Sequence, residues 1–318
     1  MIADAVRNSS EHRKNKSGAT KQQPVTSTKK KDQVPSGDDA AYRAYDQGKY
    51  LTALELAQKA AAKGEPTAHT LIARIFAEGQ GVARDMKKAA DHYRQGAELG
   101  DTNAAFALGL LLARGDGVEK NFDDAAGMFE RAALTGHAEA NYNLGLLFLN
   151  GTGKPKNEHR AAKHIAYAAE QGLAAAQYDV GTLYQNGVGV DHSAAEASRW
   201  IRAAADQGMA AAHFEYAVML LQGRGLSEDE PRAAELMNQA ANKGVVGAQN
   251  RLAHMYGEGV GVKASELDMA KWRFIAKSGE LEDELLDARV AKLPKKIQQQ
   301  AQNLADAWLE KSLVSPLN

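Results

Sequence analysis

Glycine pairs are the residues of this sequence whose type and spacing come nearest to a known chemical motif. A glycine-rich turn cradles phosphate groups when it follows a strand and continues to a third glycine. Pairs such as Gly115-Asp116-Gly117 do not continue in this way, and no Gly-Lys-Ser/Thr phosphate loop occurs. The pairs therefore predict turns between helices, and the sequence predicts no nucleotide or other cofactor.

Histidines and carboxylates are the other groups with chemical potential. A zinc pair on a helix needs two histidines four residues apart, whereas His159 and His164 are five apart. His92 and His164 share a repeat position with Trp200, which favours packing roles for both. Acidic pairs such as Asp123-Asp124 precede apolar helical patterns, where the helix dipole favours negative charge. No Gly-x-Ser-x-Gly nucleophile turn is present, so we expect a protein that is not an enzyme and has no catalytic or metal-binding residues.

The amino-acid composition excludes several classes of protein. Lysine and arginine total 39 against 40 acidic residues, a net charge of −1 that argues against a strongly basic nucleic-acid binder. The absence of cysteine excludes disulfides, thiolate catalysis and cysteine-based zinc sites. No run of about 18 apolar residues occurs, so no transmembrane segment is expected. The apolar content of 44% suits a globular or repeat protein.

The turn glycines recur at a fixed interval. The first glycine of each pair follows the previous one by 36 residues, at Gly79, Gly115, Gly151, Gly187, Gly223 and Gly259. A further glycine lies 21 residues after each of them, from Gly100 to Gly244, and the last unit closes at Gly279, one residue short. A period of this length is typical of solenoid arrays.

Each repeat reads as two helices. Unit three has Ala140, Leu144, Leu147 and Phe148 before its glycine pair, a spacing that places them on one helix face. Tandem alanines and a closing glycine mark the end of the second helix. Glycines inside the first helix, such as Gly145, destabilise an isolated helix by about 1 kcal/mol, so their recurrence predicts close approach of two helices.

This repeat pattern resembles that of the Sel1-like repeat family, which is related to tetratricopeptide repeats. The matching pattern is Ala-x3-Leu-Gly-x-Leu/Met-Tyr/Phe-x2-Gly-x-Gly, followed by Ala-x2-Trp/Phe and Ala-Ala-x2-Gly, and its best copies are 140–153 and 176–208. Trp200 and Trp272 stand at the aromatic position of the family. The resemblance implies an all-α, right-handed α-solenoid of stacked helix pairs.

Four segments follow from this pattern. Residues 1–37 form a basic tail with too few apolar residues to fold, and residues 38–66 form a degenerate leading unit similar to a tetratricopeptide. Six repeats cover 67–280, and 281–318 supply capping helices. In the cap, Leu281, Leu285, Leu286 and Val290 fit one helix, and Pro294 starts a second helix with a polar outer side.

A candidate binding surface comes from the first helices. By analogy with tetratricopeptides, positions 12, 9, 5, 2 and 1 before the first turn glycine face the concave side. Position nine carries aromatic rungs in four consecutive repeats, at Phe106, Tyr142, Tyr178 and Phe214. Polar companions on the same surface are Arg74, Arg114, Asn150, Asn186, Gln222 and His254. Aromatic rings flanked by amides and charges suit a bound peptide, although the rings can also serve only to pack helices.

The resemblance implies a scaffold or adaptor that binds another protein or peptide in bacterial signalling, envelope regulation or host interaction. Alternatives are a periplasmic regulator of a sensor kinase controlling exopolysaccharide, and an enzyme acting on cell-wall or glycan substrates, which would need convergent carboxylates. The tail, with a net charge of +5 from eight basic and three acidic residues, allows weak contact with an anionic surface. The sequence as written predicts a cytoplasmic protein, whereas the family favours export after removal of a signal peptide.

Overall fold

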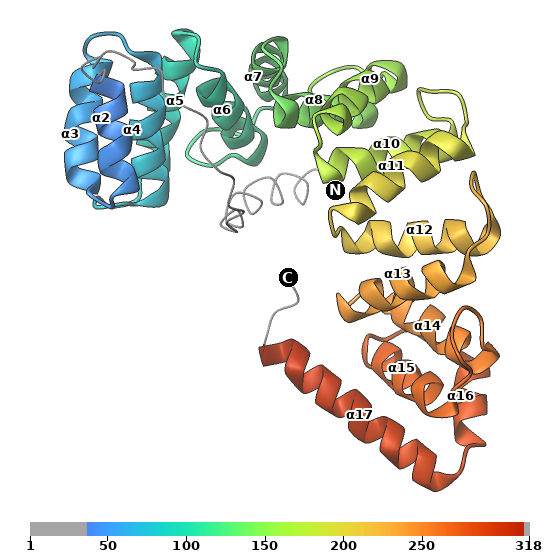
Figure 1. Cartoon of the computed structure of the whole chain (residues 1–318). Coiled ribbons are helices and arrows are strands. Elements are labelled where there is room, and N and C mark those ends of the chain that lie inside the picture. Colours follow the sequence, from blue (N-terminus) through green and yellow to red (C-terminus); the bar gives the residue numbers. More distant parts are fainter. Residues whose placement is uncertain (1–36, 315–318) are drawn as a thin grey trace, which may run out of the picture. The chain divides into compact units, whose positions relative to one another are not determined.

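A computed structural model describes residues 37–314 of the chain, and every regular element in this range is a helix (Figure 1). The basic tail predicted for 1–37 lies almost wholly outside the described residues. The helices are α2 (Gly37–Asp46), α3 (Tyr50–Ala61), α4 (Pro66–Glu78), α5 (Met86–Glu98), α6 (Thr102–Arg114), α7 (Phe122–Leu134), α8 (Ala138–Asn150), α9 (Glu158–Glu170), α10 (Ala174–Asn186), α11 (Ala194–Asp206), α12 (Ala210–Gln222), α13 (Glu230–Asn242), α14 (Val246–Glu258), α15 (Glu266–Ser278), α16 (Glu284–Ala291) and α17 (Lys295–Val314).

The described residues divide into two compact units, the first ending at Gln171 and the second beginning at Gly172. In the first unit the helix pairs are α2/α3, α4/α5, α6/α7 and α8/α9, and in the second they are α10/α11, α12/α13 and α14/α15, followed by α16 and α17. Within each unit the two helices of a pair pack together, and the second helix packs on the first helix of the next pair. The predicted all-α solenoid of helix pairs is confirmed.

Glycine ends the first helix of each pair as the sequence predicts. Gly151, for example, has φ of 68° and donates its N–H to the carbonyl of Leu147, which is the left-handed cap that glycine adopts without steric cost. The second helices begin with side-chain caps; Asn157 accepts a hydrogen bond from the N–H of Arg160. These local signals fix the helix boundaries before any packing occurs.

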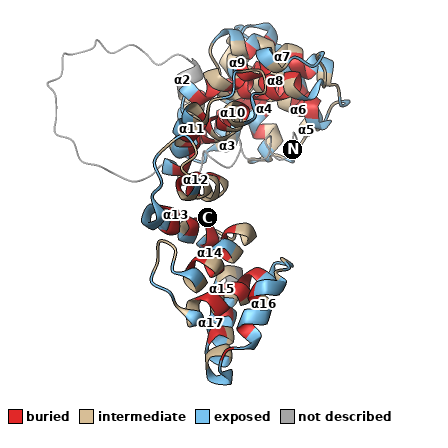
Figure 2. Ribbon diagram, turned by 90° about the vertical axis from the view of Figure 1, so that its right-hand side faces the viewer, coloured by how far each residue is buried: buried red, intermediate tan, exposed pale blue. Residues whose placement is uncertain are grey.

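In the pairs α6/α7, α8/α9 and α10/α11, the two helices meet at a glycine inside the first helix. A Cβ atom on Gly145 would lie 2.7 Å from Cγ1 of Ile165, and one on Gly181 would lie 2.6 Å from Cγ1 of Ile201. Leu144, beside this contact, is 1% exposed. Figure 2 shows both buried and exposed residues along the helices, with further exposed residues in the loops. The predicted close approach is confirmed.

A second periodic feature of the core is polar and escaped the sequence prediction. Asn141, Gln177, His213 and Gln249 are spaced by 36 residues on first helices, and all four are buried. Asn141 donates from Nδ2 to the carbonyl of His137 at 3.1 Å, and Gln249 donates from Nε2 to the carbonyl of Ala241 at 3.2 Å. Ala241 lies in the last turn of α13, whose terminal carbonyls lack helical partners. The Ala241 carbonyl also accepts the N–H of Gly244 at 3.1 Å, and the bond from Gln249 pairs a buried amide that would otherwise lack a partner.

The last repeat corrects one expectation. Gly279 was expected to close the unit one residue early, but its φ is −87° and the left-handed residue is Glu280, with φ of 62°. Glu280 stands at the regular 36-residue interval after Gly244, so the register is intact. Gly279 has a different function, because a Cβ there would lie 2.7 Å from Cγ2 of Val246.

The C-terminal helices also differ in part from the prediction. Leu281 was predicted in the same helix as Leu286 and Val290, but it precedes α16, which begins at Glu284. Leu286 and Val290 are buried, whereas Leu285 is 81% exposed. The reason is geometric, since adjacent positions on a helix point about 100° apart, and α16 presents only one narrow side to the core. The side chain that anchors this end is Arg273 of α15, which has no exposed surface.

Arg273 makes four hydrogen bonds. Its Nε and Nη2 donate to the two carboxylate oxygens of Asp287 at 2.8 and 3.0 Å, and its Nη1 donates to Asn250 Oδ1 at 3.0 Å and to the carbonyl of Leu281 at 2.9 Å. The hydrogen bonds from Arg273 lower the pKa of Asp287. The buried charge is thus fully paired, which burial of a guanidinium requires. It ties α14, α15 and α16 together.

Half-buried histidines occupy packing positions, which confirms the reading of His92 and His164. His92 stacks on Phe76 with ring centroids 6.3 Å apart, and His164 stacks on Phe148 at 5.8 Å. Nδ1 of His92 also lies 3.2 Å from Nδ1 of His69, a hydrogen bond that requires one of the two nitrogens to be unprotonated. Burial lowers the pKa of both rings, and in His92 the nearby His69 lowers it further while Asp91 raises it.

The core contact at Leu144 provides a stability test. We expect Leu144→Asp to destabilise the first unit by more than about 3 kcal/mol, because the carboxylate would be buried without a partner. Thermal unfolding followed by circular dichroism measures this, with the exposed Leu134→Asp as the control. An unchanged transition in Leu144→Asp would show that this residue is not part of the core.

The left-handed conformation of Glu280 predicts a substitution that stabilises the protein. We expect Glu280→Gly to raise the free energy of unfolding by roughly 0.5–1 kcal/mol, because glycine removes the clash that a Cβ causes at positive φ. Glu280→Ala retains the Cβ and serves as the matched control, for which no comparable gain is expected. Chemical denaturation of the two variants separates these outcomes.

The histidine pair predicts a pH dependence. Because the folded-state pKa values of His69 and His92 lie below the unfolded value of 6.5, the unfolded state binds more protons as the pH falls. The contribution of the two neutral histidines to stability is therefore fully present above pH 6.5, and the melting temperature should drop as the pH decreases below that value. His92→Phe keeps the stack on Phe76 but cannot titrate, so its melting temperature should fall less over the same range. An equal fall would exclude the pair as the cause.

Candidate partner-binding surface

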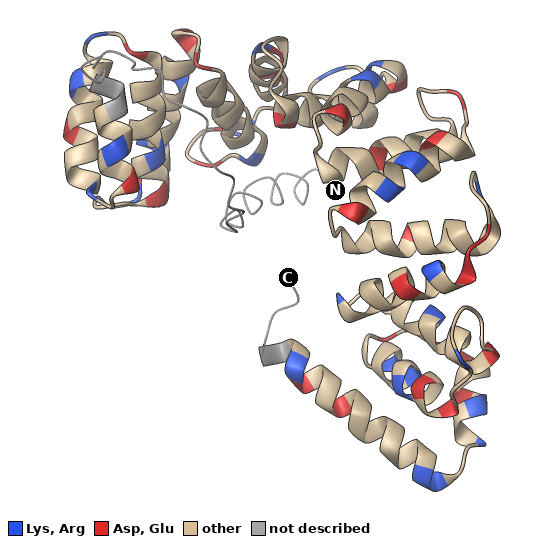
Figure 3. Ribbon diagram, in the orientation of Figure 1, with Lys and Arg blue, Asp and Glu red and all other residues tan. Residues whose placement is uncertain are grey.

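The polar residues predicted on the first helices lie mostly at the helix ends and in solvent. Arg114, Asn150, Asn186 and Gln222 are the last residues of α6, α8, α10 and α12, and all are exposed. These residues and Arg74, His254, Phe106, Tyr142, Tyr178 and Phe214 are called the first-helix surface below. Figure 3 shows acidic and basic residues interspersed along the helices.

The aromatic rungs are less accessible than their polar companions. Tyr142 is 6% exposed, whereas Phe106, Tyr178 and Phe214 are half-buried. The ring of Phe106 lies 4.4 Å from that of His137, the N-cap residue of α8. The ring of Phe214 lies against Gly247 in the first turn of α14, where a Cβ would make an ordinary contact of 3.6 Å with Cζ. Phe106 and Phe214 therefore contact the start of the next first helix within their unit.

Polar residues make the same contact in the repeats that lack a ring. Thr70 donates a hydrogen bond from Oγ1 to Asp101, the N-cap residue of α6. Asn250 donates from Nδ2 to Oδ2 of Asp283 at 2.8 Å, and Asp283 is the N-cap residue of α16. This repeat position thus links neighbouring helices within a unit at Thr70, Phe106, Phe214 and Asn250. A partner that contacts Phe106 or Phe214 would therefore also contact the junction between two repeats.

Arg74 belongs to a polar cluster in the first unit that the sequence did not reveal. Its Nε donates to Glu78 at 2.9 Å, and its guanidinium carbon lies 4.7 Å from the ring centroid of Tyr45. The Tyr45 hydroxyl donates to Glu78, and burial together with this bond raises the pKa of Tyr45. The phenol consequently remains protonated, and Arg74 is held in place rather than freely mobile.

A second cluster surrounds Glu215 in the other unit. Glu215 Oε1 accepts hydrogen bonds from Gln185 Nε2 at 3.0 Å and from Arg224 Nη2 at 3.5 Å. Burial, followed by the carboxylates of Glu215 and Asp179, raises the pKa of Tyr178. Tyr178 therefore keeps its hydroxyl proton at neutral pH. Glu215 was missed because its repeat position carries different residue types elsewhere, such as Asn143 and Arg251, so periodicity offers no signal.

His254 is engaged within its own unit. Its Nε2 lies 2.7 Å from Asp283 Oδ2. Partial burial raises the pKa of Asp283, but hydrogen bonds from the Leu286 N–H, Asn250 and His254 outweigh that effect and lower it to about 2. The carboxylate is therefore charged at all ordinary pH values. This contact fastens the N-terminus of α16 to α14.

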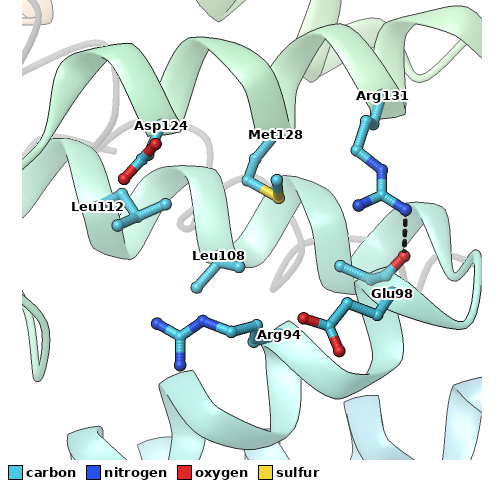
Figure 4. A pocket seen from close by; sticks show the side chains of 8 residues that line it. Arg94, Glu98, Leu108, Leu112, Asp124, Met128 and Arg131 are labelled. Atoms are coloured by element: carbon cyan, nitrogen blue, oxygen red, sulfur yellow. Dashed lines mark hydrogen bonds between the residues drawn. The ribbon is translucent and has the colours of Figure 1, made fainter.

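A groove on the second helices was not anticipated. Leu108 and Leu112 of α6 form the base of a cavity of about 180 Å³ that lies between α5 and α7 (Figure 4). Its walls carry Arg94, Ala97 and Glu98 from α5 and Asp124, Met128 and Arg131 from α7. Arg131 Nη2 donates to the carbonyl of Ala97 at 2.8 Å and bridges the walls at one end. These residues define the α5–α7 groove, which continues into a cavity of about 450 Å³ toward the loop after α6.

Two further features concern the described residues as a whole. Between residues 37 and 314, no group of three or more histidine, aspartate or glutamate side chains is arranged to hold a metal ion. No helix in the same range combines the length and apolar character needed to cross a membrane.

Comparison with solved structures shows the same architecture elsewhere. A protective antigen of uropathogenic Escherichia coli, c5321, has an SLR fold and matches at 29% identity with a TM-score of 0.75 over 86% of this chain. The chain spans 60% of the length of that protein. A Sel1 repeat protein from Oxalobacter formigenes matches at 28% identity with a TM-score of 0.69, over 76% of this chain and 99% of the other. Among curated proteins, none matches the chain.

The family model for the Sel1 repeat matches residues 43–65, 66–101, 102–137, 138–173, 174–209, 210–245 and 246–271. The segment 43–65 falls in the degenerate leading unit and is matched as a repeat. Proteins built from these repeats generally act as non-enzymatic scaffolds for protein–protein interaction. With seven matched segments covering more than half of its length and two solved relatives of the same architecture, this chain belongs to the Sel1 repeat family.

Proposed function

We propose that the chain is a non-catalytic scaffold that binds another protein or a peptide on its first-helix surface. The observation that carries this proposal is the exposed polar residue ending successive first helices: Arg114 and Asn150 in one unit, Asn186 and Gln222 in the other. Repetition at one helical position gives regularly spaced hydrogen-bonding groups, which is what an extended or helical peptide requires.

The amides are held in a defined arrangement. Asn150 donates from Nδ2 to the carbonyl of Leu146 at 2.8 Å, and Asn186 donates from Nδ2 to the carbonyl of Thr182 at 2.9 Å. Each side chain thereby uses its NH₂ group on its own helix. The side-chain oxygen remains as the acceptor for a backbone N–H of the partner. Little rotamer entropy is then lost on binding.

Tyr178 supplies a complementary donor. Because its hydroxyl stays protonated, it can donate to a partner carbonyl while its half-buried ring offers apolar contact. Among the rungs, Tyr142 has the least exposed surface, so we assign it to packing between repeats first. The binding contribution is therefore expected to come mainly from Tyr178, Phe106 and Phe214.

The solved relatives suggest a biological setting. The Escherichia coli relative is described as a protective antigen. On this basis we infer a role in bacterial signalling, envelope regulation or host interaction for the present chain, with host interaction favoured by that one description. A periplasmic regulator of a sensor kinase remains a more specific version of the same proposal.

Capture of the partner tests the function. Immobilised full chain is incubated with a lysate, and bound proteins are identified by mass spectrometry. The double variant Asn186→Ala/Gln222→Ala is used in parallel, with Arg202→Ala on the exposed side of α11 as the control. A partner retained by the wild type and the control but lost by the double variant supports the proposal.

For a purified partner, we expect Asn186→Ala/Gln222→Ala to weaken binding at least about tenfold, since two acceptors for the partner's backbone are lost. Calorimetry measures the affinity, and thermal unfolding should stay close to wild type because both residues are exposed. Equal affinities for wild type and variant would rule out this part of the surface.

A further inference from the structure

The α5–α7 groove has a counterpart in the second unit that is already filled. Adding 144 residues, four repeats, to Glu98 and Met128 gives Asn242 of α13 and Trp272 of α15. Trp308 of α17 donates from Nε1 to Asn242 Oδ1 at 3.1 Å. Its ring lies edge-on to that of Trp272, with centroids 5.9 Å apart. The space between the second helices α13 and α15 is thus a binding position for an indole side chain in this protein.

Helix α17 shows how a helix can occupy that binding position. It packs on α15 through the fully buried Ala301 and Ala305, and Trp308 reaches from the same helix to α13. The small residues allow close helix contact, while the tryptophan supplies the large anchor. An amphipathic helix with one indole side chain is therefore the ligand that the architecture of this site accommodates.

The α5–α7 groove offers equivalent groups to an indole. Glu98 stands at the Asn242 position with an exposed carboxylate that can accept an indole N–H. Met128 stands at the Trp272 position, half-buried, and a thioether contacts aromatic rings favourably. The base is apolar, with Leu108 and Leu112 beneath, and Arg94 at the rim can stack on the ring (Figure 4).

The part of the groove next to Glu98 and Met128 is small, and it opens into the cavity of about 450 Å³ toward the loop after α6. A cavity of about 180 Å³ holds one large side chain, whereas pockets for drug-sized ligands run to roughly 300–1,000 Å³. The walls carry both signs of charge, Arg94 and Arg131 opposite Glu98 and Asp124. Such a rim suits the charged flanks of an amphipathic helix rather than a polyanion.

We propose that the α5–α7 groove binds a helical segment of a partner protein that inserts one tryptophan side chain between α5 and α7. The groove lies on second helices, whereas the proposed function uses first helices, so the chain would offer two docking surfaces.

The test uses the chain's own occupant as the probe. A fluorescein-labelled peptide of residues 295–314 is titrated with full-length protein and followed by fluorescence anisotropy. We expect saturable binding, weakened at least about tenfold when the peptide carries Trp308→Ala, as for a central anchor. Glu98→Lys in the protein should weaken binding to a similar extent, because it removes the acceptor and places a cation at the rim.

A matched control locates the binding. Asp206 occupies the repeat position of Glu98 on α11 and is equally exposed, but the half-buried Tyr216 replaces Leu108 at the base there. Asp206→Lys therefore makes a similar charge change at a site without the open base, and it should bind the peptide like the wild type. Melting curves of both variants check that the fold is retained.

Two results would overturn the proposal. One is the absence of saturable binding, or equal binding by Glu98→Lys and wild type, which would place any peptide at the α17 site instead. The other is self-association of the wild type that Glu98→Lys abolishes, which would identify the occupant as α17 of a second copy rather than a partner protein.

Discussion

Close approach of two helices at a glycine is the contact on which the described structure depends. At Gly145 and Gly181, the isoleucine of the following helix occupies the space where a Cβ would be. This contact aligns the two helices but leaves each pair with an apolar side that it cannot bury alone. Stacking on the next pair supplies the missing partner surface, so stability arises between repeats as much as within them.

Polar groups then specify how the pairs stack. The buried amides of Asn141 and Gln249 bond to backbone carbonyls at or before the start of their own helices. Where the array ends, Arg273 and Asp283 take over this role with charged groups, and all their partners lie in α14, α15 and α16 or the loop between the last two. An unpaired charge or amide in these positions would destabilise the fold, so each of these bonds favours the observed packing.

The same geometry links packing to binding. The rung position of the first helix contacts the N-terminus of the next first helix, as Phe106 does with His137. A ligand that touches the rungs would therefore stiffen the joint between neighbouring repeats. The second helices leave shallow grooves that an extra helix can fill, as α17 does with Trp308. The first-helix surface and the grooves between second helices both result from the stacking of helix pairs, because one side of the array is formed by first helices and the other by second helices.

The sequence alone determined the helices, their boundaries and the repeat, because glycine caps such as Gly151 and the spacing of Leu144 and Leu147 are local signals. It also predicted the residues of the first-helix surface, since they occupy equal positions in successive repeats. Tertiary structure decided what periodicity cannot encode: that Glu280 takes the left-handed position while Gly279 admits Val246, and that Glu215 gathers its partners near Tyr178. These features depend on which side chains from different helices meet, and no local pattern carries that information.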